Sequence, residues 1–219
     1  LPADWSQTLR IPLGSAWHDA DLSVPAEPRG LVVFAHGSGS SRLSVRNQAV
    51  AQALNQRGFA TLLFDLLTPQ ENQRPAARFD IPLLAARLRA VLDWVGTQPV
   101  LAPLGLGLFG ASTGAAAALL AAASEAAGIA AVVSRGGRPD LAGSQALSRV
   151  QTPTLLIVGG DDHEVLALNR RAAAAMPGQV ELVVVPGATH LFEEADTLDE
   201  VAAFAGDFFP RHLPPATSP

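Results

Sequence analysis

The sequence has 219 residues, of which 48% are hydrophobic and 16% are charged, and its net charge at pH 7 is −5. This length and composition predict one globular domain with a large buried core, which we expect to span residues 1–210. Prolines and small polar residues fill the last positions, so we expect residues 211–219 to form a disordered tail.

Residue usage excludes several classes of protein. Every positive charge is an arginine and no basic run is present, so we expect no nucleic-acid partner. No apolar stretch is long enough to span a membrane, and the absence of cysteine excludes disulfides, thiolate metal sites and a cysteine nucleophile. The first residues lack the basic and then apolar pattern of a signal peptide, which favours a cytoplasmic location. The sequence leaves the oligomeric state open.

Hydrophobic periodicity predicts two opening strands and then an alternation of strands and helices from residue 31 onward. The predicted strands cover residues 7–13, 17–24, 31–35, 60–64, 106–109, 129–133, 154–158 and 180–185. The predicted helices cover residues 44–57, 81–95, 113–121, 141–149, 165–175 and 198–209. We expect the first two strands to pair antiparallel, with Trp5 and Trp17 covering one end of the core, and residues 66–80 to form a long surface loop. The alternation predicts an α/β fold, with a mostly parallel, twisted sheet and helices on both faces.

The segment 104–121 is the most informative part of the sequence. An apolar strand leads into Gly110-Ala111-Ser112-Thr113-Gly114 and then into an alanine-rich helix. Strand, G-x-S-x-G and helix in this order are the context of a nucleophile elbow, in which Ser112 occupies a strained conformation at the tip of a tight turn. Side chains at positions 110 and 114 would collide with the turning backbone, so glycine fits both. The alternative is a buried turn whose serine only caps the helix.

A serine nucleophile needs a base, commonly a histidine oriented by a carboxylate. Among the five histidines, His190 lies in a loop after the last predicted strand, where it can reach Ser112. Asp162 follows the preceding strand and suits the orienting role, whereas Asp161 is expected to face solvent. The alternative for the acidic run 161–164 is a metal site. Four consecutive positions rarely converge on one ion, so we expect no metal and no cofactor.

These motifs resemble a known family. The order Ser112, Asp162, His190 and the loop His36-Gly37-Ser38-Gly39-Ser40 are similar to the α/β-hydrolase fold. The segments 134–143, 155–165 and 185–194 resemble the small members without a cap domain that group with the dienelactone hydrolases. The resemblance covers nearly the whole chain. It implies a Ser112-His190-Asp162 catalytic triad and an oxyanion hole formed by the main-chain N–H groups of Ser38 and Thr113.

The resemblance has one departure and several implications for the substrate. Dienelactone hydrolases of this group use a cysteine nucleophile where this chain has Ser112, which favours an esterase over a lactone-opening enzyme. The short stretch between residues 134 and 154 leaves no room for a helical cap, so we expect an open site for small or short-acyl esters. Candidate substrate contacts lie in the loops at the strand ends: Arg42, Arg135 and Arg138 for a carboxylate, and Leu66, Leu67, Leu191 and Phe192 for an acyl group.

The sequence therefore predicts a serine carboxylesterase that acts through an acyl-enzyme intermediate. A lactonase, a thioesterase or a peptidase using the same triad remains an alternative. An inactive hydrolase-like binding module is a further alternative from a different class. Each arginine and leucine named above could equally pair with protein acids or pack on the core.

Overall fold

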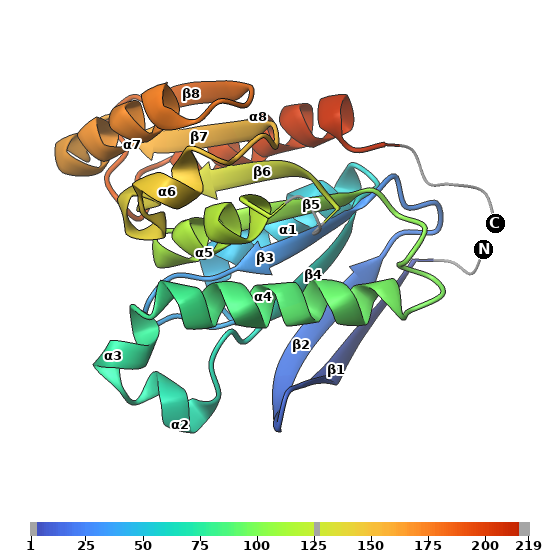
Figure 1. Ribbon diagram of the computed structural model, residues 1–219. Coiled ribbons are helices and arrows are strands. Elements are labelled where there is room, and N and C mark those ends of the chain that lie inside the picture. Colours follow the sequence, from blue (N-terminus) through green and yellow to red (C-terminus); the bar gives the residue numbers. More distant parts are fainter. Residues whose placement is uncertain (1–3, 125–127, 215–219) are drawn as a thin grey trace.

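The computed structural model describes residues 4–124 and 128–214, and its framework is an eight-stranded sheet (Figure 1). The strands are β1 Trp5–Leu13, β2 Ala16–Val24, β3 Leu31–Ala35, β4 Ala60–Phe64, β5 Leu106–Ala111, β6 Ile129–Arg135, β7 Thr154–Gly159 and β8 Val180–Val185. They lie in the order β1-β2-β4-β3-β5-β6-β7-β8. The β1–β2 and β2–β4 pairs are antiparallel and the other pairs are parallel. The sequence predicted the antiparallel first pair and the mostly parallel sheet, but not the pairing of β2 with β4.

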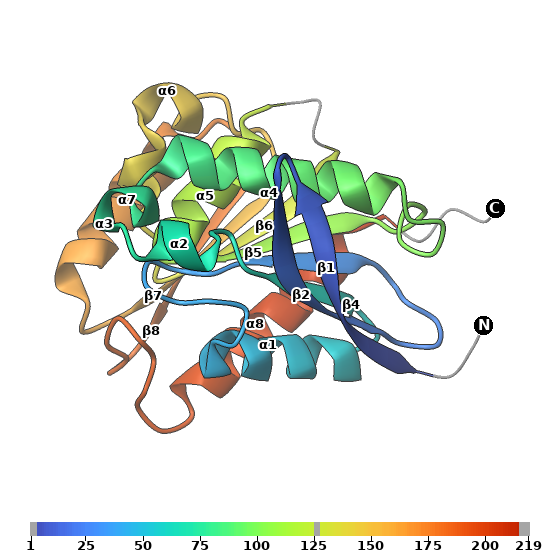
Figure 2. The ribbon, with the colours of Figure 1, turned by 90° about the horizontal axis from the view of Figure 1, so that it is seen from below.

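Helices cover both faces of the sheet (Figure 2). One face carries α1 Val45–Gln56 and α8 Thr197–His212. The other carries α4 Ile81–Gly96, α5 Thr113–Ala122, α6 Ser144–Leu147 and α7 His163–Ala175. The chain leaves β3 to form β4 on one side and returns to form β5 on the other side of β3. The strand order therefore reverses at β3 and β5. Open α/β sheets bind their ligands at the carboxyl ends of the strands beside such a reversal.

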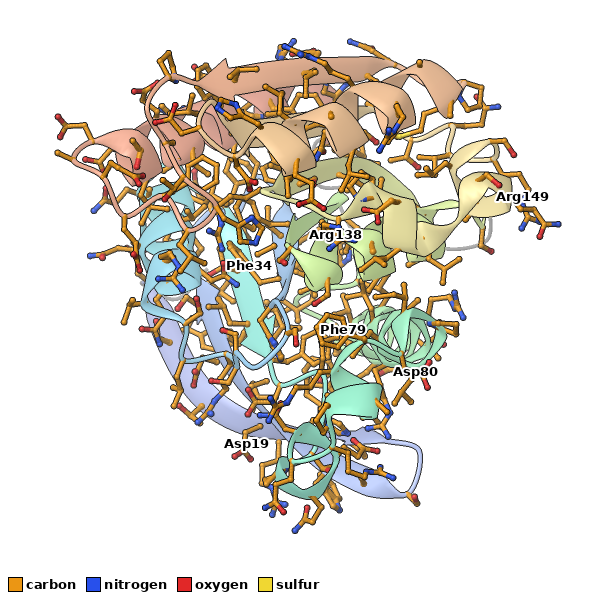
Figure 3. The ribbon with its side chains drawn as sticks, turned by 90° about the vertical axis from the view of Figure 1, so that its left-hand side faces the viewer. Asp19, Phe34, Phe79, Asp80, Arg138 and Arg149 are labelled. Carbon is orange, nitrogen blue, oxygen red and sulfur yellow. The ribbon has the colours of Figure 1, made fainter. Side chains whose placement is uncertain are left out.

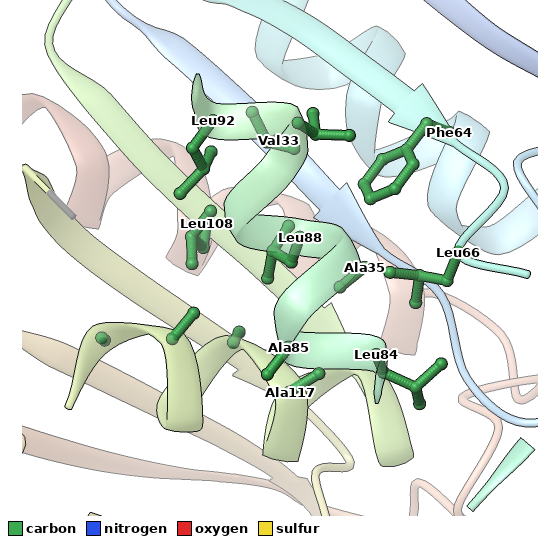
Figure 4. Packing of buried hydrophobic residues seen from close by; sticks show 14 of the residues in the cluster. Val33, Ala35, Phe64, Leu66, Leu84, Ala85, Leu88, Leu92, Leu108 and Ala117 are labelled. Carbon is green, nitrogen blue, oxygen red and sulfur yellow. The ribbon is translucent and has the colours of Figure 1, made fainter. Parts of the chain in front are cut away.

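The sheet divides the core into two clusters of different composition. The α1/α8 face is rich in phenylalanine: Phe34, Phe59, Phe109, Phe192, Phe208 and Phe209 are all buried there. The α4/α5 face is aliphatic, and Figure 4 shows Leu84, Ala85, Leu88 and Leu92 of α4 packed over the sheet. α5 is buried on nearly every side, and its alanines let neighbouring helices and strands approach closely.

Trp17 does not cover the core as predicted. It is 56% exposed, and the guanidinium of Arg10 lies 5.9 Å from its ring centre. In β2 the buried side chains begin at His18 and alternate along the strand, so Trp17 faces the opposite side of the sheet. Trp5 is partly buried and packs against the aliphatic cluster, as expected.

Segment 66–80 is not an irregular surface loop. It contains the one-turn helices α2 Pro69–Asn72 and α3 Pro75–Arg78, and it begins with the buried Leu66 and Leu67. A capping box between Thr68 and Glu71 starts α2, and a proline stands in the first turn of each helix. These capping signals were present in the sequence, but the helices are too short to show a hydrophobic period.

The helix predicted over residues 141–149 is broken in two. A 3₁₀ helix, η2 Pro139–Ala142, precedes α6, and Gly143 between them has φ +84°. A left-handed glycine stops a helix, so the two short turns cannot merge. No cap domain is inserted between β6 and β7, a region that the structure describes completely.

The end of the chain differs from the expected tail. Arg211 and His212 belong to α8, and Leu213 is buried against the phenylalanine cluster. The expected tail also includes residues 215–219, which lie outside the described residues.

Candidate active site

Ser112 stands at the turn between β5 and α5 in a strained conformation, with φ +51° and ψ −119°. A Cβ atom at Gly110 would lie 2.5 Å from Cα of Ala115, and one at Gly114 would lie 2.1 Å from the main-chain oxygen of Ala35. Both glycines are therefore required by close backbone contacts, as the elbow geometry predicted. The Ser112 side chain makes no capping hydrogen bond to α5, which contradicts the alternative in which it serves only as a helix cap.

The loop after β3 lies directly against the elbow. A Cβ atom at Gly37 would be 3.2 Å from Cβ of Ser112, so Ser38 follows at the edge of the site. Thr113 is the first residue of α5, a position whose N–H group has no partner within the helix. The predicted oxyanion donors, the main-chain N–H groups of Ser38 and Thr113, thus belong to two segments that meet at Ser112.

His36 fixes this loop to the segment that follows β4. Its Nε2 accepts the N–H of Leu66 at 3.0 Å, and its Nδ1 donates to the main-chain oxygen of Gly37 at 3.0 Å. Both bonds require the neutral ring, with the proton on Nδ1. Burial lowers the pKa of His36 below 6.5, which favours this neutral form.

His190 and Asp162 form a hydrogen-bonded pair at the carboxyl edge of the sheet. Nδ1 of His190 lies 2.7 Å from Oδ2 of Asp162, and the carboxylate is the more buried partner. The loops that carry them are joined by a hydrogen bond from the N–H of Asp161 to the oxygen of Ala188 at 3.0 Å. The side chain of Asp161 is exposed, as predicted.

The Ser112 and His190 loops meet at the end of β6. The N–H of Ser112 donates to the main-chain oxygen of Arg135 at 3.2 Å. A Cβ atom on the next residue, Gly136, would lie 3.7 Å from Cε1 of His190. The Ser112 hydroxyl and the His190 imidazole form no hydrogen bond in this structure. Such bonds are often long before substrate binds, so the arrangement is compatible with a triad.

Two of the three predicted substrate arginines are paired with protein carboxylates. Arg42 contacts Asp21 at 3.2 Å and Asp65 at 3.3 Å. Arg138 holds Asp140 with two hydrogen bonds of 2.9 and 2.7 Å. Figure 3, which views the sheet from its carboxyl edge, shows Arg138 near the centre of this face. Both arginines therefore pair with protein acids, which is the alternative to substrate binding that the sequence left open.

Arg135 has a different environment. The residue is 6% exposed, and its Nη2 lies 3.4 Å from Oδ1 of Asn47 in α1. Burial, followed by the charge of Arg46, lowers the pKa of Arg135 to about 10. Its guanidinium lies 5.8 Å from the ring centre of Phe192.

A small cavity of about 10 Å³ adjoins the loop after β3 and the start of α5. Leu66, Leu67 and Leu84 line it together with Thr113 and Arg78. Figure 4 shows Leu66 and Leu84 at the same end of the aliphatic cluster. Leu84 and Arg78 were not among the residues predicted from the sequence, because nothing in the local pattern places α3 and α4 over this loop.

The remaining predicted contacts do not line this cavity. Leu191 is 41% exposed beside His190, and Phe192 is buried in the phenylalanine cluster. Within the described ranges, no group of three or more histidine or acidic side chains could hold a metal ion. No helix of the described residues is both long and apolar enough to cross a membrane.

Residues 28–203 match the family described as "Alpha/beta hydrolase domain". The chain belongs to the α/β-hydrolase family. A crystal structure of a dienelactone hydrolase from Anabaena variabilis is 46% identical, superimposes with a TM-score of 0.93, and covers 97% of this chain and 100% of its own. Est1E from Butyrivibrio proteoclasticus is 18% identical with a TM-score of 0.80, covers 93% of this chain and 98% of its own, and shares the fold.

A relative from Mycobacterium tuberculosis strain H37Rv, named "Putative phosphoribosyl transferase", is 60% identical over 207 residues. The match covers 94% of this α/β-hydrolase but 46% of the relative. The chain thus spans less than half the length of the curated relatives that it matches.

Proposed function

We propose that this α/β-hydrolase is a serine esterase in which Ser112 is the nucleophile, His190 the base and Asp162 the residue that orients His190. The observation that supports this most directly is the 2.7 Å bond between His190 Nδ1 and Asp162 Oδ2. With Nδ1 bound to the carboxylate, the other ring nitrogen, Nε2, is the one left to accept a proton from Ser112.

The proposed reaction has two steps. Oγ of Ser112 attacks the ester carbonyl carbon while His190 takes its proton, and His190 then gives this proton to the departing alcohol. Water, deprotonated by His190, then attacks the acyl-enzyme; as the bond between the acyl carbon and Oγ breaks, His190 returns the proton to Oγ and the acid is released. Asp162 stabilises the imidazolium that forms in each step. The N–H groups of Thr113 and Ser38 would bind the oxyanion, and loss of one such donor typically costs about 3 kcal/mol in the transition state.

The surroundings of the site favour a small acyl group. The cavity beside Thr113 measures about 10 Å³ and is lined by Leu66, Leu67 and Leu84. A space of this size holds about one water-sized group, so an acetyl methyl fits better than a long acyl chain. The absence of a cap between β6 and β7 leaves the leaving-group side open to solvent.

The names of the relatives suggest two other kinds of substrate, and both can be tested in one substrate panel. The Anabaena protein is named a dienelactone hydrolase, so lactones belong in the substrate panel. The mycobacterial relatives are named as phosphoribosyl transferases, but they are more than twice as long as the matched region. Phosphoribosyl pyrophosphate is therefore included as a substrate, and its turnover by this chain would contradict the esterase proposal.

A fluorophosphonate probe and a series of p-nitrophenyl esters of increasing acyl length test the proposal. We expect covalent labelling of Ser112 and a kcat/KM that is highest for the acetate. Ser112→Ala should lose labelling and fall by several orders of magnitude in kcat, and Asp162→Asn by about 10³–10⁴-fold because it supports the wrong tautomer. Ser148→Ala, at the exposed end of α6, is the matched control and should keep wild-type rates. Full turnover by Ser112→Ala would refute the proposal.

A further inference from the structure

Arg135 is a buried charged group that the proposed reaction does not use. Among the described residues, the only hydrogen bond of its guanidinium is the long one to Asn47, and its Nε has no partner. Across residues 4–124 and 128–214, no carboxylate forms an ion pair with it. The charge of another guanidinium, that of Arg46, repels it.

This arrangement destabilises the fold. A guanidinium that leaves water without a carboxylate partner loses hydration that one long hydrogen bond does not replace. A methionine would fill similar space without that penalty, since buried charges can often be replaced by apolar side chains with no loss of stability. Stability therefore does not explain Arg135, and residues of this kind are typical of functional sites.

Two contacts connect Arg135 to both halves of the candidate active site. Its main-chain oxygen accepts the N–H of Ser112 at 3.2 Å. Its guanidinium faces the ring of Phe192, the second residue after His190, at 5.8 Å. A cation–π contact is stronger when the cation is desolvated, as Arg135 is.

Phe192 needs such support. It is 2% exposed and has φ +55°, a left-handed conformation that phenylalanine rarely adopts and that its surroundings must maintain. The next residue, Glu193, pairs with Arg46 of α1 at 3.3 Å. Two arginines from different elements thus contact consecutive residues of the loop that carries His190, Arg135 in the core and Arg46 at the surface.

We propose that Arg135 is a positioning residue that holds the loop 187–196 through Phe192 and so keeps His190 within reach of Ser112. This proposal rests on the serine-esterase function proposed above. It explains why a buried cation without a counter-ion is retained beside the nucleophile. It assigns the exposed pair between Arg46 and Glu193 a minor role, because solvent screens surface ion pairs.

The test uses Arg135→Met and Arg135→Lys. The matched control is Arg46→Met, which removes a guanidinium of α1 that contacts the same His190 loop through Glu193. We expect Arg135→Met to unfold in urea at the wild-type midpoint or above it, while kcat on p-nitrophenyl acetate falls about tenfold to a hundredfold and KM changes less than about threefold. Arg135→Lys, which keeps the charge but not the planar group, should recover part of kcat. Arg46→Met should keep kcat within about twofold.

A double-mutant cycle with Phe192→Leu tests whether Arg135 acts through Phe192. If it does, Arg135→Met should lower kcat much less in the Phe192→Leu background than in the wild type. Wild-type kcat in Arg135→Met overturns the proposal. A loss of kcat that matches a loss of stability also overturns it. A loss confined to esters that carry a carboxylate overturns it too, because Arg135 would then be a substrate-binding residue.

A second readout separates this proposal from the esterase proposal. In ¹H NMR spectra of Ser112→Ala, the His190 Nδ1 proton bonded to Asp162 should give a far-downfield resonance. That resonance should broaden or shift when Arg135→Met is added, whether or not the wild type hydrolyses esters. An unchanged resonance overturns the positioning role, whereas a wild type without esterase activity overturns only the proposed function.

Discussion

His36 provides a sharp test of how the oxyanion loop is held. Its two ring nitrogens make different bonds, one to the N–H of Leu66 and one to the oxygen of Gly37. His36→Asn places an amide nitrogen near the position of Nδ1 and keeps the donor to Gly37, but it leaves the N–H of Leu66 without an acceptor. His36→Gln can place its oxygen near Nε2 and keep the acceptor for Leu66, but it loses the donor to Gly37.

The two substitutions should differ in stability. Leu66 is fully buried, so its unpaired N–H in His36→Asn costs about 1–3 kcal/mol of unfolding free energy. The carbonyl of Gly37 lies in a half-buried loop, so its lost partner in His36→Gln costs only about 0.5–1.5 kcal/mol. Activity should follow the same order. If the loop in His36→Asn moves away from Ser112 and one oxyanion donor is lost, kcat falls by about a hundredfold.

The same residue makes stability depend on pH. Burial lowers the pKa of His36 below 6.5, so the unfolded chain takes up a proton at a higher pH than the folded protein does. The contribution of the neutral ring is therefore fully present above pH 6.5 and is lost as pH falls toward the folded pKa, by at most about 1.4 kcal/mol per pH unit. His36→Gln should show a shallower decline below pH 6.5 than the wild type. Burial also lowers the pKa of His18, so some decline should remain.

Urea unfolding on both sides of pH 6.5, together with kcat on p-nitrophenyl acetate, measures all three effects. The reasoning would be refuted by equal stabilities of His36→Asn and His36→Gln. An unchanged pH slope in His36→Gln would show that folding does not lower the pKa of His36.

Gly114→Ala should abolish folding, because the added methyl group would lie 2.1 Å from a main-chain oxygen of β3. Its control is Gly96→Ala, whose methyl group would have no atom within 4 Å and which should raise the unfolding free energy by about 0.5 kcal/mol. A soluble, cooperative Gly114→Ala protein by circular dichroism would contradict the steric argument. Leu213→Ala should lower the unfolding free energy by about 2 kcal/mol, because Leu213 is 7% exposed and packs on the phenylalanine cluster. Urea unfolding with no change in midpoint would show that the chain beyond α8 adds nothing to the core.

The fold could be predicted from the sequence because its signals are local and repeated. Most strands from residue 31 onward are short apolar runs, and α4 shows a hydrophobic stripe that the structure buries. The elbow is equally local, since Gly110 and Gly114 lie within two residues of Ser112. Short helices such as α2 and α3 escaped prediction because one turn has no period, although their capping residues were visible.

Ion pairs could be predicted from the sequence only where the two partners lie close together along the chain. Arg138 pairs with Asp140, two residues away, and the sequence alone made that partner plausible. The partners of Arg42 come from β2 and from the loop after β4, which become neighbours only through the strand order of the sheet. A sequence can place an arginine at a strand end, but it cannot show which carboxylates the sheet will bring there.

Arg135 shows where this limit affects function. Its position at the carboxyl end of β6 could be predicted from the sequence. What bears on its role is that the guanidinium contacts Asn47 of α1 and Phe192 and forms no ion pair with a carboxylate of the described residues. Strand alternation fixes that direction, because Arg135 lies on the same face as Val133, which belongs to the phenylalanine cluster. That Arg135 is buried without a counter-ion depends on the face of β6 on which it lies and on the order of strands in the sheet. Neither property appears as a motif in the sequence.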